Sequence, residues 1–364
     1  ILLAIQKVLT HSFDVPMSMN FPSLIAMGSM ILLLINISVG MFDKRFFSGA
    51  MITTALMLKK LMRSPHQFLI PSALILAVFP ILPPLKPQPN VIMIFLPFVV
   101  TPFFLPKVAK NVLTFEMIRI CLTALIIAEI IDGRSGLSWF ILITSPLSIF
   151  LYPVRPKALR LTGVIYGLLC PLALLSAAYE PQVFCLLGVH LISILKTIED
   201  QEEPLSIRKL QERSLDFQDM TTAAYFMLYI LLSFFGTGNI ASISSFDPMW
   251  TRHFITIFSP FTMTFLILLK LGIPLILIGC TSRILTSSST FLAVLLLGDC
   301  LSLPLMYSVS SHGSWLDIGT AISRYSISIT LPCLFVILYY MSSPLMVCHL
   351  TPRWPISFPK DHFT

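Results

Sequence analysis

Two oppositely charged residues, Glu116 and Arg119, lie inside the long apolar run LTFEMIRICLTALIIAEI at residues 113–130. Residues three apart share one face of an α-helix, so this carboxylate and this guanidinium can pair. Charges at bilayer depth are costly, which makes such residues candidates for a functional site. One interpretation is contact with a zwitterionic lipid headgroup. The other is a self-neutralising pair close to the membrane interface.

Two polar turns interrupt the apolar runs further along the chain, FFGTGNIASISSFDP at 234–248 and SHGSWLDIGTAIS at 311–323. Gly236 and Gly238 suit the C-terminal end of a helix, and Asp247 followed by proline suits a helix start. The GTGN segment lacks the lysine and the strand context of a phosphate-binding P-loop. Capping explains both turns, and headgroup contact is the functional alternative. The candidates for that contact are Asn239, Ser242, Ser244, Asp247, Trp315 and Asp317.

Histidine and cysteine form no recognisable catalytic or metal signature in this sequence. None of the seven cysteines forms a CxxC pair, and the seven histidines show neither HExxH nor HxxxH spacing. We therefore expect no catalytic residue, no metal site and no cofactor in this chain. Lys270 and Asp299 are isolated charges inside apolar runs, and we hypothesise that they pair with each other.

The composition places these residues in a membrane protein. The chain of 364 residues is 56% hydrophobic and only 11% charged, whereas a soluble domain carries about 25% charged residues. The net charge is +7, and many basic residues lie in short segments between apolar runs, which is typical of cytoplasmic loops and headgroup contacts. Nucleic-acid binding is therefore excluded. The expected fold class is an all-α polytopic membrane protein without a soluble α/β domain.

Long apolar runs and abundant proline predict a bundle of about ten to twelve kinked transmembrane helices. We expect an N-terminal half over 1–195, a charged connector over 196–220, a C-terminal half over 221–350 and a short polar tail over 351–364. The segment 196–219 carries seven of the seventeen acidic residues. The predicted spans are 23–41, 66–84, 91–106, 112–132, 137–153, 158–178, 181–197, 221–236, 253–280, 288–309 and 319–347, with 46–62 as a weaker candidate.

Several long motifs resemble one family. FFGTGNIASISSFDP, FSPFTM, LKLGIP, GSWLDIGTAISRY and the terminal PKDHF are similar, in this order, to the C-terminal membrane region of the PIG-N family of GPI ethanolamine phosphate transferases. The resemblance is strongest over about 221–325, and over 1–220 it rests mostly on hydropathy. The segment 221–350 is therefore expected to be the signature region of the family.

The resemblance implies an endoplasmic-reticulum, multi-pass membrane enzyme of GPI-anchor biosynthesis. Family members transfer phosphoethanolamine from phosphatidylethanolamine to the first mannose of the GPI precursor, using an α/β catalytic domain with a zinc-type metal centre. No segment here resembles that domain, so no catalytic residue is carried over. The chain begins with Ile1, and we expect a membrane portion of a longer protein that is inactive alone. The implied partners are the two lipid substrates, and the oligomeric state stays open.

Two other functional classes remain possible from the sequence. A lipid transporter or scramblase would also contain kinked helices and charged spans, although no inverted repeat is visible. A non-catalytic scaffold would recruit partners of the same pathway through the charged segment 196–219. Both are alternatives to the role that the resemblance implies, in which this portion anchors the enzyme in the membrane and helps to present its lipid substrates.

Overall fold

The computed structural model is built from α-helices wherever the chain is described. It describes residues 21–61, 65–82, 90–106, 110–128, 135–177, 179–201, 217–235, 251, 253–255, 259–285, 288–309 and 314–347. Within these ranges there are twelve α-helices, two short 3₁₀ helices and no strand. The all-α part of the predicted fold class is therefore confirmed for the described residues.

The helices follow the apolar runs of the sequence closely. They are α2 (Phe21–Gly40), α3 (Phe46–Leu61), α4 (Leu69–Leu76), α5 (Val91–Phe104), α6 (Lys110–Ile127), α7 (Ser135–Leu147), α8 (Lys157–Leu174), α9 (Glu180–Gln201), α11 (Phe217–Phe235), α12 (Pro260–Leu285), α13 (Ser288–Ser308) and α14 (Trp315–Val347). The 3₁₀ helices are η1 (Phe79–Ile81) and η2 (Ser148–Leu151). The weaker candidate at 46–62 is thus helical over Phe46–Leu61.

Two boundaries differ from the expected spans for physical reasons. The predicted span 66–84 is split into α4 and η1, because Pro80 lacks the N–H that would bond the Leu76 carbonyl. At the predicted connector 196–220, α9 continues to Gln201 and α11 begins at Phe217, so both helices extend into this range, and the connector itself stays a prediction. Residues with good helix propensity, such as Lys196, let α9 extend into the connector. Residues 202–216 lie outside the described part.

The helices form two compact units. Unit 1 comprises 1–84, 193–246 and 281–340, and unit 2 comprises 85–192, 247–280 and 341–364. The units interleave along the sequence, so each contains helices from both of the expected halves. The division into N-terminal and C-terminal halves stays a prediction.

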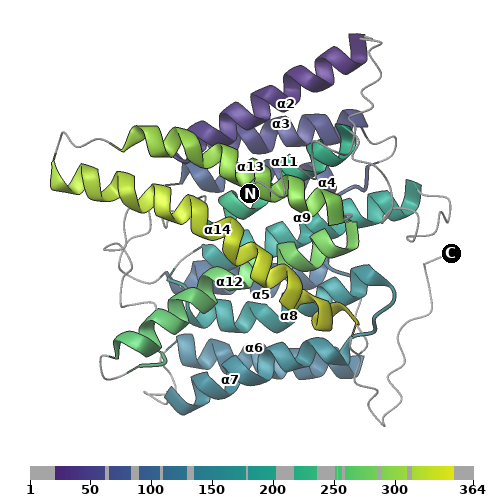
Figure 1. Ribbon diagram of the computed structural model, residues 1–364. Helices are drawn as coiled ribbons and strands as arrows, with labels where there is room; N and C mark the ends of the chain where they lie inside the picture. The colour runs from purple at the N-terminus through teal and green to yellow at the C-terminus, as the bar shows by residue number, and fades with distance from the viewer. Residues whose placement is uncertain are drawn as a thin grey trace. The chain divides into compact units, whose positions relative to one another are not determined.

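Unit 1 is stabilised by apolar contacts between helices and by a hydrogen bond from a lysine side chain. In Figure 1, α2 and α3 lie side by side, and α11 packs against α2, α3 and α13. The Phe47 ring of α3 stacks on Phe235 of α11 with centroids 6.3 Å apart. Lys44, in the turn after α2, donates from Nζ to the carbonyl of Leu82 just after η1. This bond satisfies a helix-end carbonyl.

Unit 2 is organised around α8. Every residue of α8 from Ala158 to Leu174 is buried, and α8 packs against α6, α7 and η2. Glycines allow this close approach. A Cβ on Gly163 would lie 2.5 Å from Cγ of Tyr152, and a Cβ on Gly167 would lie 2.5 Å from Cγ1 of Ile149. These glycines are four residues apart, which is the small-residue spacing that brings helices together in membrane proteins.

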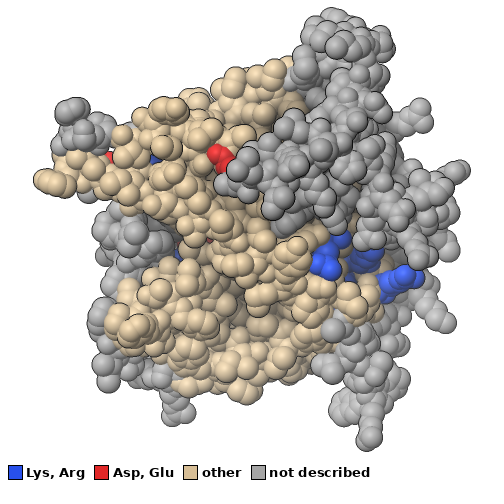
Figure 2. Space-filling model, in the orientation of Figure 1, with Lys and Arg blue, Asp and Glu red and all other residues tan. Residues whose placement is uncertain are grey.

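Several helices expose apolar side chains along their length. Four are long and apolar enough to cross a membrane, judged by length and composition over the described residues: Lys157–Leu174, Glu180–Ile198, Pro260–Leu285 and Asp317–Val347. Exposed apolar side chains on the last two include Phe261, Phe265, Leu268, Ile322, Ile329 and Ile337. Figure 2 shows one face on which most described side chains are uncharged. The exposed apolar side chains of the last two helices suit lipid contact.

The glycine packing of α8 leads to a prediction. Gly167→Ala is expected to lower the free energy of unfolding by about 1–3 kcal/mol, because the added methyl group would collide with Ile149 and crowd the Ser145 carbonyl. Gly136→Ala is the matched control, since Gly136 lies in α7 with nothing within 4 Å of an added Cβ. Thermal unfolding of both variants in detergent tests this. Equal melting temperatures would contradict the close approach of α8 to α7 and η2.

Candidate functional site

The predicted headgroup contacts fall into three groups. Asn239, Ser242, Ser244 and Asp247 lie outside the described residues, so their headgroup contact stays a prediction. Trp315 and Asp317 are exposed in the first turn of α14. Glu116 and Arg119 are together in the interior of unit 2.

Asp317 has a local structural role at the start of α14. The Ser314 hydroxyl donates to Oδ2 of Asp317 at 2.7 Å, and the Asp317 N–H donates back to Oγ of Ser314 at 3.2 Å. This reciprocal arrangement resembles a capping box and satisfies orphan groups at the helix N-terminus. Trp315 is 90% exposed beside it, as expected of an aromatic anchor at a membrane interface. Capping therefore accounts for Asp317, and headgroup contact stays a prediction for both residues.

In the part of the chain that the structure describes, buried charged side chains occur in unit 2. Among described residues, five charged side chains are buried, and all five belong to that unit: Glu116, Arg119, Arg160, Glu180 and Lys270. Burial of a charge is costly unless the group is paired and hydrogen-bonded. These five side chains are therefore the strongest candidates for a site within the described chain.

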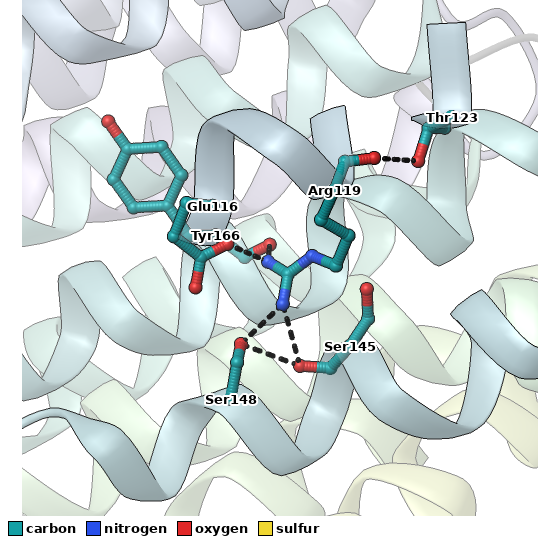
Figure 3. A network of polar contacts seen from close by, with 6 residues as sticks. All are labelled: Glu116, Arg119, Thr123, Ser145, Ser148 and Tyr166. Atoms are coloured by element: carbon teal, nitrogen blue, oxygen red, sulfur yellow. Dashed lines mark hydrogen bonds and ion pairs between the residues drawn. The ribbon is translucent and has the colours of Figure 1, made fainter. Parts of the chain in front are cut away.

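Glu116 and Arg119 form an ion pair on one face of α6, as their spacing predicts. The carboxylate of Glu116 is fully buried, and Arg119 is 5% exposed. Figure 3 shows the guanidinium pointing away from α6 toward two neighbouring helices. Burial favours the self-neutralising interpretation, although the pair lies inside the unit and not at an exposed edge. Headgroup contact stays a prediction.

Arg119 joins three segments of the chain. Its Nη1 donates to Oγ of Ser148 at 2.6 Å and to the Ser145 carbonyl at 3.4 Å, and its Nη2 donates to the Tyr166 carbonyl at 2.8 Å. These acceptors belong to η2, α7 and α8. The Ser148 hydroxyl also donates to the Ser145 carbonyl at 2.8 Å. One guanidinium thus fixes α6 against the α7–η2 junction and against the middle of α8.

The sequence around Ser145 explains why acceptors are available there. Pro146 lies in the last turn of α7, and the chain then tightens into η2 at Ser148. Carbonyls at such a helix end lack intrahelical partners and accept from side chains instead. The hydroxyl of Ser145 and Oε1 of Glu116 are buried without a hydrogen-bond partner among the described residues. The network therefore contains buried polar atoms that its own hydrogen bonds and ion pair do not satisfy.

Further buried polar groups extend this network. Tyr152 is fully buried, and its hydroxyl lies close to the Glu116 carboxylate. Cys170 on α8 lies close to Arg119 and Thr123. The Thr101 hydroxyl of α5 contacts Sγ of Cys185 on α9 at 3.3 Å. Cys170 and Cys185 are buried as small apolar residues, whereas Cys121, Cys300 and Cys333 are exposed.

Arg160 is a second buried arginine, although it is one of the basic residues that the sequence analysis counts in short segments typical of cytoplasmic loops and headgroup contacts. It donates from Nη1 to the carbonyls of Ile149 at 2.6 Å and Tyr152 at 2.8 Å. Its Nε donates to the Leu345 carbonyl at 2.6 Å, in the last turn of α14. A cation is favourable where helices end, because their carbonyls carry partial negative charge. The position of Arg160 near Pro153 and Pro156, where helices end and begin, was the available signal.

Within unit 2, Lys270 pairs with a carboxylate that the sequence had not suggested. Its Nζ lies 2.8 Å from Oε1 of Glu180, and both side chains are 4% exposed. Asp299 belongs to unit 1, so the hypothesised pairing of Lys270 with Asp299 stays a prediction. Glu180 is the first residue of α9, where a carboxylate is stabilised by the helix N-terminus. Sequence reasoning overlooked Glu180 because it lies at the edge of an apolar run.

The described residues provide charged groups suited to binding. No group of three His, Cys, Asp or Glu side chains that could hold a metal ion occurs in the described ranges. The buried charges offer an ammonium, two guanidinium groups and two carboxylates in apolar surroundings. Such groups can hold or orient charged parts of a ligand.

Comparisons with known proteins agree with the motifs noted in the sequence. The model of phosphatidylinositolglycan class N (PIG-N) matches residues 2–314. Proteins named GPI ethanolamine phosphate transferase 1 are similar in Homo sapiens (34% identical over 225 residues, 56% of this chain and 24% of the relative) and in Aspergillus oryzae (32% over 253 residues, 59% and 25%). The chain thus spans about a quarter of the length of these relatives. No solved structure matches.

The Arg119 network leads to a second prediction. Glu116→Ala is expected to lower the free energy of unfolding by about 3–5 kcal/mol, because it leaves a buried guanidinium without its carboxylate. Glu116→Gln keeps an acceptor for Arg119 and is expected to cost less. Arg45→Ala is the control, since Arg45 is exposed in the turn before α3 and its loss should change stability by less than about 0.5 kcal/mol. Denaturant unfolding in micelles measures all three.

A similar loss in Glu116→Ala and Arg45→Ala would contradict the assignment. It would mean that the ion pair contributes no more than an exposed charge. Equal losses in Glu116→Ala and Glu116→Gln would show that negative charge, and not a hydrogen-bond acceptor, is what Arg119 requires.

Proposed function

The chain belongs to the PIG-N family, and from this premise we propose that it is the membrane portion of a GPI ethanolamine phosphate transferase. In this role it anchors the enzyme as a multi-pass bundle in the endoplasmic-reticulum membrane and presents lipid substrates. The reaction is transfer of phosphoethanolamine from phosphatidylethanolamine to the first mannose of the GPI precursor. The family match over residues 2–314 is the observation that carries the proposal.

The lengths and exposed faces of the helices support the anchoring role. A helix of 33 residues, such as α14, is about 50 Å long. A bilayer has a hydrocarbon core of about 30 Å, so α14 can cross it with a tilt or with an end in the interface. The exposed Trp315 at its start fits the interfacial end. The shorter apolar helices complete the polytopic bundle in this proposal.

The catalytic step belongs to other parts of the full-length enzyme in this proposal. The chain spans about a quarter of its human relative, and its described residues contain no cluster able to hold a metal ion. The zinc-type centre implied by the family would therefore be supplied elsewhere. The share of this chain is to hold lipids where that centre can act on them. Asn239, Asp247 and the other polar-turn residues would line the headgroup region in that role.

The proposal is tested by exchanging the matching region of the human relative for this chain. In cells lacking the human enzyme, we expect the chimera to restore GPI-anchored proteins at the cell surface, because the lipid-presenting region is retained. A chimera with unrelated membrane helices of the same number is the control and should fail. Flow cytometry of a GPI-anchored reporter measures both.

Two outcomes would contradict the proposal. Rescue by unrelated helices would show that the region only anchors the enzyme. Transfer of phosphoethanolamine by this chain alone would show that it contains the catalytic centre. A chimera that is expressed in the correct membrane but does not restore the reporter would favour a different class, such as a transporter or a scaffold.

A further inference from the structure

We propose that Glu180 and Lys270 form a binding site for the ammonium–phosphate headgroup of a lipid, with the carboxylate receiving the ammonium and the lysine the phosphate. This inference rests on the proposed function and assigns its headgroup chemistry to a specific place in unit 2. The ion pair observed between the two residues is then the closed form of the site. No bond is made or broken in this step.

The two side chains are complementary to such a headgroup. Lys270 and Glu180 lie 2.8 Å apart on two different helices, α12 and α9, and each is 4% exposed. Oε2 of Glu180 has no hydrogen-bond partner among the described residues. A zwitterionic headgroup carries one ammonium and one phosphate. Its ammonium can replace Lys270 as the partner of Glu180, and its phosphate can replace Glu180 as the partner of Lys270. The charge balance of the buried site is thereby preserved.

Two helix N-termini lie at this end of unit 2. Gln182, in the first turn of α9, donates from Nε2 to the Met93 carbonyl in the first turn of α5 at 2.9 Å. The N–H of Asn90, which caps α5, donates to the Ala177 carbonyl just before α9 at 2.8 Å. Helix N-termini carry partial positive charge and unpaired N–H groups, which favour phosphate. At the N-terminus of α9, the carboxylate of Glu180 is the anion that this partial positive charge stabilises.

The surroundings favour a lipid over a soluble molecule. Asn90 is exposed, and Gln182 is half-buried, so polar surface reaches this end of the unit. Phe265 and Leu268, within five residues of Lys270 on α12, are exposed apolar side chains. At about 100° per residue these two side chains lie on the outer face of α12, away from Lys270, where acyl chains can lie while the headgroup reaches between the helices. A free phosphate compound would gain nothing from these apolar contacts.

The Glu116–Arg119 pair is less suited to this role. Both of its residues are on α6, so separating helices does not separate the charges. The guanidinium is also held by Ser148 and by the carbonyls of Ser145 and Tyr166. A ligand would have to replace all these bonds. The Glu180–Lys270 pair instead joins residues of two helices, α9 and α12, so a headgroup placed between these helices would meet one charge from each.

The test measures lipid retention by the whole chain and needs no catalysis. The chain is placed in nanodiscs that contain phosphatidylcholine with phosphatidylethanolamine or phosphatidylglycerol, and lipids retained after mild detergent washing are quantified by mass spectrometry. For Glu180→Gln/Lys270→Met, we expect preferential retention of phosphatidylethanolamine to fall about tenfold. Replacing a buried ion pair by neutral groups is often tolerated, so this variant should remain folded.

Glu180→Gln alone is the second variant, in case the double variant does not fold. It retains the lysine for phosphate and loses the carboxylate for ammonium. We expect its preference to shift from phosphatidylethanolamine toward phosphatidylglycerol, which has a phosphate and no ammonium. The matched control is Thr264→Val, which changes an exposed residue of α12 outside the site without changing its charge.

Specific outcomes would overturn the inference. Unchanged lipid preference in a folded double variant, or in Glu180→Gln, would leave the pair as a purely structural contact. Soluble phosphoethanolamine displacing all retained lipid at equal concentration would overturn the assignment to a lipid. Either result would leave the rescue of GPI-anchored proteins by the chimera unaffected, so a failure here is distinguishable from a failure of the proposed function.

Discussion

A guanidinium or ammonium group buried among apolar helices loses its water, and this loss must be offset by an opposite charge or by several hydrogen bonds. The interior of unit 2 meets this constraint in three ways. Arg119 has a carboxylate on its own helix together with three acceptors from elsewhere. Arg160 has three backbone carbonyls, and Lys270 has a carboxylate on another helix. Each solution fixes different helices.

The backbone supplies most of these acceptors because the helices end or tighten where the arginines lie. Pro146 and the 3₁₀ turn after it leave carbonyls at the end of α7 and η2. Gly163 and Gly167 let α8 approach this region closely, and the Tyr166 carbonyl between them reaches Arg119. A larger residue at either glycine would move the acceptor away from the guanidinium. In unit 2, the compensation of the buried arginine charge therefore depends on the close packing at the two glycines.

Much of the helical structure follows from the sequence, because apolar runs of suitable length permit few alternatives. The Glu116–Arg119 pair was predictable for a related reason, since both residues are three apart on one helix. The partner of Lys270 was not, because Glu180 comes from a helix 90 residues earlier and only packing brings them together. Arg160 was also missed, since its acceptors are carbonyls that no side-chain pattern reveals.

The two units differ in their buried charged side chains, and this difference suggests that they have different roles. The described part of unit 1 buries rings such as Phe47 and Phe235 and none of the charged side chains, and its helices α13 and α14 expose apolar residues. Such helices need only an apolar solvent to be stable. Unit 2 retains charges at a cost in desolvation, and a cost of this kind persists where it serves packing specificity or ligand binding. The intrahelical pair at Glu116 serves packing, whereas a pair that spans two helices also allows exchange with a ligand.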